Sequence, residues 1–543
     1  MNSATPHLWW QTGVIYQIYP RSFQDSTGNG LGDLAGIIQR LDYLSGTLGI
    51  DAVWLSPFYP SPMADFGYDV ADYTGVDPLF GDLETLDRLV DQLHSRGLKI
   101  IIDLVPNHTS DQHPWFVQSR ASRDNPKRDW YVWADPKPGG APPNNWLSVF
   151  GGRAWEWEPA TGQYYLHSFL KEQPDLNWRN PEVQAAMFDV VRFWLERGID
   201  GFRIDVAHYI MKDPELRDNP PNPHAGKSLH KPLGDYDSQN HLYDKGHPDV
   251  HTIYRRFRQL LESYSTEQPR MSIGEVHIFD WEEWASYYGR HLDELHMPFN
   301  FQLLNVPWHA PSVRRVVDAL EAVLPAGAWP NYVLGNHDES RLATRLGPAQ
   351  TRIAAMLLLT LRGTPTLYYG DELGMADVPI PPEQQQDPWG LRVPGLGRDP
   401  CRTPMQWSAA IHAGFSPPDT PATWLPLTPD WQTVNVEQQL ANPGSLLNLY
   451  RRLVALRKAS PALQYGDYQA VEAVPEDCYV YFRRSTDQRF LVAMNFSGQE
   501  QTLDLPAPGT GTLRAGTDLA RPLAVVENQL ELRENEGVII EFA

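Results

Sequence analysis

The stretch Gly201-Phe-Arg-Ile-Asp-Val-Ala-His208 decides how the chain is interpreted. Its apolar residues alternate with polar or small ones, which is the period of a β-strand. One face of this strand is therefore apolar, and the other carries Arg203 and Asp205. A cation and a carboxylate inside a core-like segment are costly unless they are paired. The pair predicts either a structural ion pair within a sheet or part of a functional site.

Composition narrows the class of protein. The chain has 543 residues, of which 42% are hydrophobic and 21% charged, as in globular proteins with a large core. A net charge of −22 argues against nucleic acid or an anionic membrane as a partner. Two cysteines, no secretory signal and no long apolar run lead us to expect a cytoplasmic monomer or homodimer with a small-molecule substrate.

Strand-like and helix-like segments alternate along most of the chain. Eight strands are expected, at 14–19, 52–55, 98–105, 201–208, 271–276, 299–303, 332–338 and 366–370. The expected helices are 33–49, 82–96, 181–197, 250–264, 313–323, 349–361 and 445–457. Eight such units predict an α/β fold, a closed (β/α)8 TIM barrel.

Two segments depart from this alternation. Residues 106–178 are rich in Pro, Gly, Trp and Asn, and a long irregular insertion of this kind is usually functional. We expect them to form a loop-rich subdomain inserted after the third strand. Residues 461–543 contain short alternating strands separated by turns, which predicts a C-terminal antiparallel β-sandwich domain. The barrel then comprises residues 1–105 and 179–460.

Active sites of such barrels lie at the carboxyl ends of the strands. Five expected strands lead there to polar residues, which are Asp65, Tyr68, Asn107, His108, Arg203, Asp205, Glu275, Asn336, His337 and Asp338. Three acids without a serine or cysteine nucleophile indicate glycoside chemistry, which needs one carboxyl to attack and another to donate a proton. The alternative is metal-assisted hydrolysis with ligands His108, Asp205, His337 and Asp338, although the sequence lacks a helical His-x-x-x-His pair.

A second group of oxygen donors follows the first expected strand. Asp25, Thr27, Asn29, the carbonyl of Leu31 and Asp33 stand at every second position, like the front half of a calcium-binding loop. The acid that closes an EF-hand is missing, so we expect a smaller loop for structural Ca²⁺ or Mg²⁺. The alternative is a Gly-rich turn that caps the next helix. No organic cofactor is expected.

At these residues the chain resembles the α-amylase superfamily, glycoside hydrolase family 13, and within it the α-glucosidase and oligo-1,6-glucosidase branch. Seven blocks in the same order carry the resemblance: Gly13-Val-Ile-Tyr-Gln-Ile-Tyr-Pro20, Asp103-Leu-Val-Pro-Asn-His108, Gln173-Pro-Asp-Leu-Asn-Trp178, 201–208, Gly274-Glu-Val276, Asn336-His-Asp338 and Gly363-Thr-Pro-Thr-Leu-Tyr-Tyr-Gly-Asp-Glu372. They span nearly the whole chain.

The resemblance implies roles for the three acids. Asp205 would be the nucleophile that forms a covalent glucosyl intermediate, and Glu275 would be the acid and then the base. Asp338 would bind the 2- and 3-hydroxyls of the distorted ring. Arg203 would hold Asp205 ionised by lowering its pKa, whereas Glu275 needs a raised pKa. The anomeric configuration would be retained, with the two carboxyl groups about 5 Å apart.

The resemblance also implies a glucose-binding pocket. His108 and His337 would donate to hydroxyls, and Tyr68 would stack on the sugar. Asp65 and Arg402 would hold the 4-hydroxyl of the non-reducing end. We therefore expect an exo-acting α-glucosidase that releases glucose from maltose, isomaltose or sucrose, with or without transglucosylation.

Substrate preference depends on fewer residues. Val206, directly after the expected nucleophile, resembles enzymes that accept α-1,6 links, and Phe150 and His277 are candidates for the aglycone side. The alternatives are a sucrose- or trehalose-directed transferase or isomerase, or an inactive binding homologue. Sucrose isomerases carry an Arg-Leu-Asp-Arg-Asp motif that is absent here, and the presence of all three acids argues against an inactive homologue.

Overall fold

The computed structural model describes residues 7–225, 232–266, 268–505 and 510–542. Eight parallel strands form its central sheet, in the order β10-β11-β1-β2-β3-β7-β8-β9. Their bounds are β1 (Ile15–Ile18), β2 (Ala52–Leu55), β3 (Lys99–Leu104), β7 (Gly201–Ile204), β8 (Met271–Gly274), β9 (Met297–Pro298), β10 (Asn331–Val333) and β11 (Thr364–Tyr368). A parallel bridge between Asn300 and Tyr332 joins the two edges of the sheet. The predicted (β/α)8 barrel is thereby confirmed.

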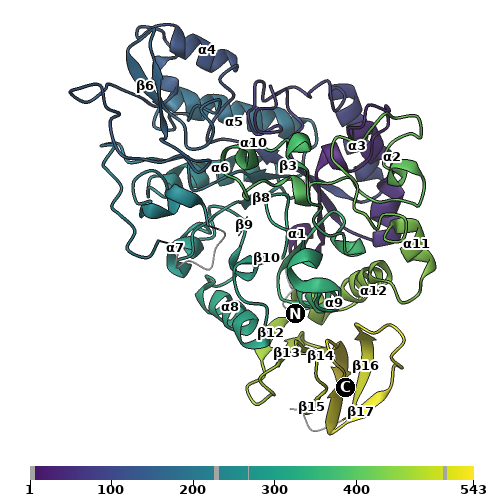
Figure 1. The fold of residues 1–543 in the computed structure, drawn as a ribbon. Coiled ribbons are helices and arrows are strands. Elements are labelled where there is room, and N and C mark those ends of the chain that lie inside the picture. Colours follow the sequence, from purple (N-terminus) through teal and green to yellow (C-terminus); the bar gives the residue numbers. More distant parts are fainter. Residues whose placement is uncertain (1–6, 226–231, 267, 506–509, 543) are drawn as a thin grey trace.

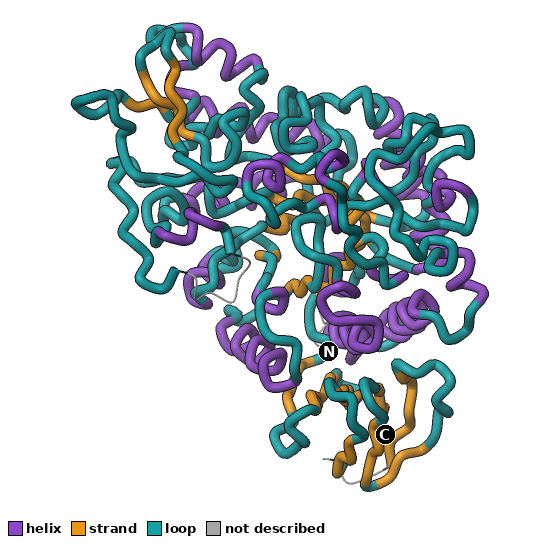
Figure 2. The backbone as a smooth tube through the Cα atoms, viewed as in Figure 1, coloured by secondary structure: helices purple, strands orange, loops and turns teal. Residues whose placement is uncertain are grey.

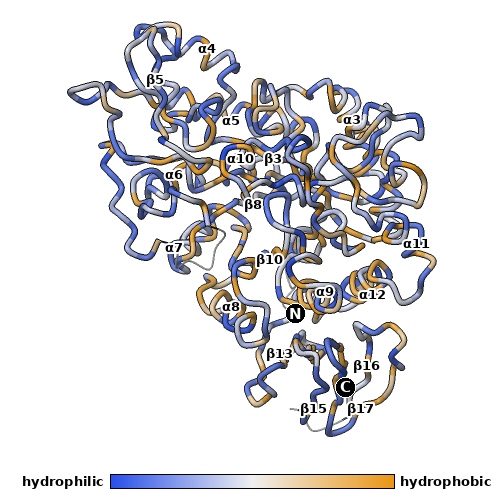
Figure 3. The backbone as a smooth tube through the Cα atoms, viewed as in Figure 1, coloured by the Kyte–Doolittle hydropathy of each residue, from blue (hydrophilic) through white to orange (hydrophobic). Residues whose placement is uncertain are grey.

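Helices surround this sheet (Figure 1). Those that follow the eight strands in turn are α2 (Leu34–Gln39), α3 (Leu83–Ser95), α5 (Pro181–Glu196), α6 (Val250–Ser263), α7 (Trp281–Ser286), α8 (Ala310–Val323), α9 (Leu342–Thr360) and α12 (Leu446–Lys458). In α3 the Asp82 side chain accepts a hydrogen bond from the N–H of Thr85, and Leu86, Leu89 and Leu93 are buried. Helices α8 and α12 carry orange and blue segments in Figure 3, because each has one buried and one exposed face.

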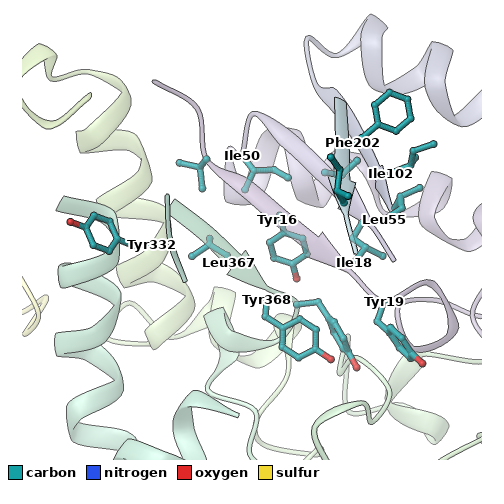
Figure 4. Close-up of a cluster of buried hydrophobic side chains, with 14 of the residues drawn as sticks. Tyr16, Ile18, Tyr19, Ile50, Leu55, Ile102, Phe202, Tyr332, Leu367 and Tyr368 are labelled. Carbon is teal, nitrogen blue, oxygen red and sulfur yellow. The ribbon is translucent and has the colours of Figure 1, made fainter. Parts of the chain in front are cut away.

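The strands place alternate side chains on opposite faces of the sheet. Outward-facing residues such as Phe202 and Ile102 join the core beneath the helices, and Figure 4 shows this cluster around β1, β2 and β11. Inward-facing residues such as Trp54 and Ile273 form a separate core inside the barrel. Arg203 is paired in register with Ile273, so its side chain also lies inside the barrel.

Three expected strands differ from the structure. The strand expected at 299–303 does not form there: the two-residue strand β9 lies directly before this range, and Gln302–Leu304 is a 3-10 turn. The strand expected at 332–338 ends at Val333, so Asn336 to Asp338 lie in a loop. Strand β7 ends at Ile204, and Val206 has a φ of 37°, which turns its side chain out of the alternation and into the cavity described below. In each case a loop or turn at the carboxyl end of the barrel replaces part of the expected strand.

The remaining elements lie in the inserted and C-terminal segments or support the barrel. The insertion contains α4 (Pro114–Ala121) and an antiparallel sheet of β4 (Trp133–Ala134), β6 (Gln163–Leu166) and β5 (Trp155–Glu158). Short helices are α1 (Trp9–Thr12), α10 (Pro388–Arg392), α11 (Val436–Ala441) and α13 (Pro461–Tyr465). Figure 2 shows the loops and turns that connect these elements around the central strands. The boundaries expected for the three domains remain predictions.

The C-terminal strands form two antiparallel sheets below the barrel in Figure 1. They are β12 (Asp467–Ala470), β13 (Cys478–Arg484), β14 (Arg489–Asn495), β15 (Gln501–Asp504), β16 (Thr510–Gly516), β17 (Val525–Glu527), β18 (Gln529–Leu532) and β19 (Gly537–Phe542). Leu503 of β15 and Leu530 of β18 pack against Leu491 and Ile540 of the larger sheet. Tyr481, on the other face of that sheet, joins the core of the barrel. Two sheets enclosing a shared core agree with the expected β-sandwich.

None of the helices in the described ranges combines the length and the apolar character that crossing a membrane requires.

Candidate active site

A cavity of about 360 Å³ opens at the carboxyl ends of the barrel strands. Nine of the eleven predicted catalytic and substrate residues line it, namely Asp65, Tyr68, His108, Phe150, Asp205, Val206, Glu275, His337 and Asp338. The other two, Arg203 and Arg402, are almost fully buried behind the wall and contact its carboxylates. The fold thus brings together residues that are 273 positions apart in the sequence, from Asp65 to Asp338.

Arg203 joins the carboxylates at the floor of the cavity. Its Nη1 donates to Asp103 Oδ1 and Asp205 Oδ1, both at 2.8 Å, and its Nη2 donates to Glu275 Oε2 at 2.5 Å. The guanidinium also lies 5.1 Å from the ring of Trp54 inside the barrel. Sequence reasoning gave no role to Asp103, which the structure places directly opposite Arg203 on the neighbouring strand. The Arg203–Asp205 pair is therefore part of a larger charged group.

The pKa values of the two central carboxyls differ in direction. Burial raises the pKa of Asp205 well above its usual value, despite the opposing charge of Arg203. Burial also opposes ionisation of Glu275, but Arg203 and a hydrogen bond from His277 together hold its pKa well below the usual value. We expected a lowered pKa for Asp205 and a raised one for Glu275, and this expectation is wrong for the observed geometry. The reason is that Arg203 lies closer to Glu275, to which His277 supplies a second donor.

Asp338 lies against two arginines and a histidine. Its Oδ1 accepts from Arg402 Nη2 at 2.9 Å and from Arg398 Nη1 at 3.2 Å, and its Oδ2 is 3.3 Å from His337 Nε2. Burial works against ionisation, but His337 and the two arginines hold the pKa of Asp338 well below its usual value. Burial also lowers the pKa of His337 to about 3. At neutral pH this corner of the cavity therefore contains a carboxylate beside a neutral imidazole.

Arg398 is the main residue that sequence reasoning missed. Its Nη2 donates to Asp65 Oδ1 at 2.6 Å, and it also binds Asp387 through Nε at 3.0 Å and Nη2 at 2.7 Å. We predicted that Asp65 and Arg402 hold the 4-hydroxyl of the non-reducing end. The guanidinium of Arg402 donates to Asp338 and to the carbonyl of His337, and the role toward the 4-hydroxyl remains a prediction. Both arginines belong to one short segment, and the 3-10 turn Asp399–Cys401 between them sends their side chains to different partners.

Aromatic rings surround this charged group. Tyr68 is stacked on His337, with ring centroids 5.4 Å apart, and its hydroxyl donates to Asp103 Oδ2 at 3.1 Å. Phe150 packs against Trp389 at 5.0 Å, below the guanidinium of Arg398 at 5.3 Å. Trp389 was not predicted, since α10 carries no motif that we recognised. The rings make the cavity partly apolar, as is common in ligand sites.

The opposite wall contains His277 and its neighbours. The Nε2 atom of His277 lies 2.8 Å from Glu275 Oε1, and its ring is stacked on Phe301 with centroids 4.3 Å apart. Phe279, Leu304 and Asn305 continue the wall. His277 was expected on the aglycone side, and the structure places it in the cavity next to the expected proton donor.

The predicted histidine ligands do not form a metal centre. His337 contacts Gln17 through Nδ1 at 2.8 Å and Tyr68 through Nε2 at 2.6 Å. His108 contacts Asn107 through Nδ1 and Gln173 through Nε2, both at 3.1 Å. Throughout the part of the chain that the structure describes, no three His, Cys, Asp or Glu side chains are grouped to hold a metal ion. The alternative of metal-assisted hydrolysis is therefore not supported by the donor geometry.

The predicted cation loop has a different donor set, with two carboxylates and neutral oxygens. Asp25 accepts from the N–H groups of Thr27, Gly28 and Gly30 at 2.8–2.9 Å. Asp33 accepts from Ser26 and caps α2 through the N–H of Gly36 at 2.6 Å. Oδ1 of each aspartate already accepts two or more hydrogen bonds, whereas Oδ2 of each accepts one and keeps a lone pair that a cation could use. The capping also agrees with the alternative of a polar turn, and the cation at Asp25, Thr27, Asn29, Leu31 and Asp33 remains a prediction.

Comparisons with known proteins agree with this geometry. Residues 17–466 match the model of the α-amylase catalytic domain. The chain is 44% identical over 524 residues to a probable α-glucosidase of Rhizobium meliloti (strain 1021), covering 93% of this chain and 94% of that protein. It is 38% identical over 537 residues to an oligo-1,6-glucosidase of Parageobacillus thermoglucosidasius, covering 92% of each. The crystal structure of an α-glucosyl transfer enzyme superposes with a TM-score of 0.93 at 44% identity, covering 99% of this chain and 100% of that one.

Proposed function

The chain belongs to the α-amylase family of glycoside hydrolases, and on this premise we propose that it is a retaining, exo-acting α-glucosidase. The observation that carries the proposal is the arrangement of Asp205 and Glu275 on one arginine, with Asp338 across the same cavity. A glucosidase needs one carboxyl to attack and another to transfer a proton. Relatives named α-glucosidase and oligo-1,6-glucosidase support this class of substrate.

In the first step a carboxylate oxygen of Asp205 attacks the anomeric carbon of the terminal glucose. The bond from that carbon to the glycosidic oxygen breaks, and its electron pair stays with the leaving oxygen. The proton of Glu275 moves to this oxygen, so the aglycone leaves as a neutral alcohol. Because the two carboxyl groups would be about 5 Å apart, no water fits between nucleophile and sugar.

In the second step Glu275, now ionised, accepts a proton from a water molecule that attacks the glucosyl ester. The ester bond to Asp205 breaks, the carboxylate returns, and glucose leaves with its α configuration. Substrate binding must first move a proton onto Glu275, since Arg203 and His277 favour its ionised form. Asp205 must give up the proton that its burial favours. The proton is thus redistributed within a coupled pair of carboxyls.

The part of the cavity lined by Asp65, Tyr68, His337 and Asp338 would bind the terminal glucose. Asp65 and Arg398 supply an acceptor and a donor side by side, as hydrogen bonding to the 4-hydroxyl requires. Asp338 and the neutral His337 would bind the 2- and 3-hydroxyls, and the ring of Tyr68 would lie against the sugar. His108 would donate to a further hydroxyl. These groups admit a chain end rather than the middle of a polysaccharide, which supports exo action.

Asp205→Asn tests the proposal most directly. We expect turnover of an aryl α-glucoside to fall about 1,000-fold or more, because an amide cannot form the glucosyl ester. The control is Asp189→Asn, a change at an exposed position of α5. Substantial turnover by a correctly folded Asp205→Asn enzyme would rule out the nucleophile assignment.

For linkage preference we propose that Val206 favours α-1,6 links. Its side chain lines the cavity beside Asp205, where it would contact the aglycone. We expect faster glucose release from isomaltose than from maltose at equal concentration. The ratio should fall about 10-fold in Val206→Thr, because a hydroxyl in an apolar wall changes which aglycone fits. A wild-type preference for maltose would instead place the specificity in Phe150, His277 and the loops.

A second candidate function is glucosyl transfer to an alcohol or sugar. It is supported by the similarity to the α-glucosyl transfer enzyme and by the apolar walls near Glu275. The chemistry is the same, except that an acceptor hydroxyl replaces water in the second step. The ratio of glucosylated alcohol to free glucose, measured with an added small alcohol, distinguishes the two outcomes.

A further inference from the structure

The two oxygens of Glu275 have different partners. Oε2 accepts from Arg203 Nη2 at 2.5 Å and from the N–H of Val206 at 3.1 Å. Oε1 lies 2.8 Å from Nε2 of His277. Arg203 and the backbone thus hold one oxygen, and the imidazole holds the other.

His277 is itself fixed in place by packing. Its ring lies almost parallel to that of Phe301, with an angle of 7° and centroids 4.3 Å apart, and Phe301 is buried. The His277 side chain is 38% exposed and lines the cavity. A ring that is stacked on one face cannot swing away from Glu275 without losing this contact.

Charged or titratable groups face the pair from both sides. On the Glu275 side these are Arg203, Asp205 and Asp338. On the imidazole side they are His208, whose ring is 6.2 Å from that of His277, and Lys245, which acts on His208. Among these groups, Arg203 contacts the Glu275 carboxyl directly, as His277 does.

We propose that His277 is a positioning residue for Glu275, which donates its Nε2–H to Oε1 and holds that oxygen at the cavity wall while the carboxyl is ionised. This inference rests on the proposed function. When the Glu275 O–H bond breaks and its proton bonds to the leaving oxygen, the new carboxylate receives the hydrogen bond from His277. In the second step a proton of water returns to Glu275. His277 keeps its own proton throughout, so the reaction balances without it.

Loss of this donor should make the ionised form of Glu275 less favourable. The pKa of Glu275 then rises. Because Glu275 has the lower pKa of the coupled pair and Asp205 the higher one, the acidic limb of the kcat/KM profile moves to higher pH. For one charge-assisted hydrogen bond we expect a shift of about 1 pH unit. Hydrolysis of a sugar aglycone should slow more than that of a nitrophenyl glucoside, whose leaving group needs little protonation.

The test compares pH profiles of the full-length enzyme with an aryl α-glucoside. His277→Ala should show the upward shift, and His277→Gln, which keeps a donor, should shift less. His277→Phe keeps the ring stack on Phe301 but has no donor, so it should show the same shift as His277→Ala. This variant separates the loss of the donor from any disturbance of the cavity wall by the smaller alanine. His241→Gln is the matched control, because His241 lines the same cavity but hydrogen-bonds Asp244 and the carbonyl of Tyr236.

An unmoved acidic limb in both His277→Ala and His277→Phe would overturn the inference. So would a limb that vanishes, because His277 would then be the titrating group. An equal shift in His241→Gln would also overturn it. These outcomes require an active wild type, whereas failure of the proposed function would show itself earlier, as no glucosidase turnover or as an active Asp205→Asn variant.

Discussion

At the scale of single residues, the geometry of the cavity depends on which carboxylates each of two neighbouring arginines contacts. Arg398 and Arg402 are four positions apart in one segment, and both contact Asp338. Only Arg398 also contacts Asp65. The fork of a guanidinium can bind two carboxylates at fixed angles, which a single ammonium cannot do. Because both residues are arginines, the direction in which the backbone aims each side chain decides which carboxylates it binds.

Arg398→Lys tests this assignment. The charge is kept but the fork is lost, so we expect kcat/KM for an aryl α-glucoside to fall about 10- to 100-fold, mainly through a higher KM. The matched control is Arg392→Lys on α10, where the guanidinium is partly exposed and lies 3.5 Å from Glu172. Unchanged kinetics in Arg398→Lys would show that the pair with Asp65 does not bind substrate.

At the scale of elements, caps and turns set where each helix or strand ends. Helix α4 begins after His113, whose ring accepts a hydrogen bond from the N–H of Trp115 at 3.1 Å. Histidine is an unusual cap, because its imidazole can accept only while neutral. Burial lowers the pKa of His113 to about 4, in agreement with that role. The stability of the inserted segment is thus linked to pH at this helix terminus.

His113→Asn should make this linkage visible, since asparagine caps well and does not titrate. The unfolded chain binds a proton at a pKa near 6.5 and the folded chain at about 4, so the folded state is disfavoured as the pH falls between these values. We expect the unfolding free energy of the wild type to decline by about 3 kcal/mol relative to the variant, from pH 7 to pH 4. Urea unfolding at several pH values measures this difference in unfolding free energy. If the free energies of wild type and variant changed in parallel with pH, the buried neutral state of His113 would be contradicted.

At the scale of the whole molecule, distant segments meet through buried polar contacts. Arg457 of α12 donates to the carbonyls of Leu359 and Leu361 at 3.0 and 3.2 Å. Arg483 of the C-terminal sheet donates to Gly466 at 2.9 Å and to Thr360 at the end of α9. These arginines satisfy carbonyls that the helix end leaves without partners. Arg457 thereby joins α12 to the end of α9, and Arg483 joins the C-terminal sheet to the barrel.

The Asp25–Asp33 loop also joins distant parts of the chain. Gly30 has a φ of 84°, and a Cβ atom there would lie 2.2 Å from the carbonyl oxygen of Ala422. The N–H of Trp424 donates to the carbonyl of Gly30 at 3.0 Å. A cation bound in this loop would stabilise the contact between the first βα connection and residues 415–424, far from Asp205 in the sequence.

We expect a chelator to lower the Tm by about 3 °C, because a cation that binds only the folded state stabilises it. Adding back Ca²⁺ or Mg²⁺ should restore the Tm. The control is Asp25→Asn, which should have the lower Tm already and respond little to the chelator. A Tm that none of these treatments changes would leave the loop as a polar turn that caps α2.

The sequence by itself determined the barrel, the three acids and the family. Strand and helix periods follow from burying one face of each element, and motifs such as 201–208 keep their order in the chain. The tertiary structure decided what each side chain touches: Asp65 pairs with Arg398, Glu275 with His277, and Val206 turns into the cavity. These contacts join residues from different loops, and a pKa depends on the sum of burial and charge around it. No local pattern encodes that sum, which is why the expected pKa directions of Asp205 and Glu275 were reversed.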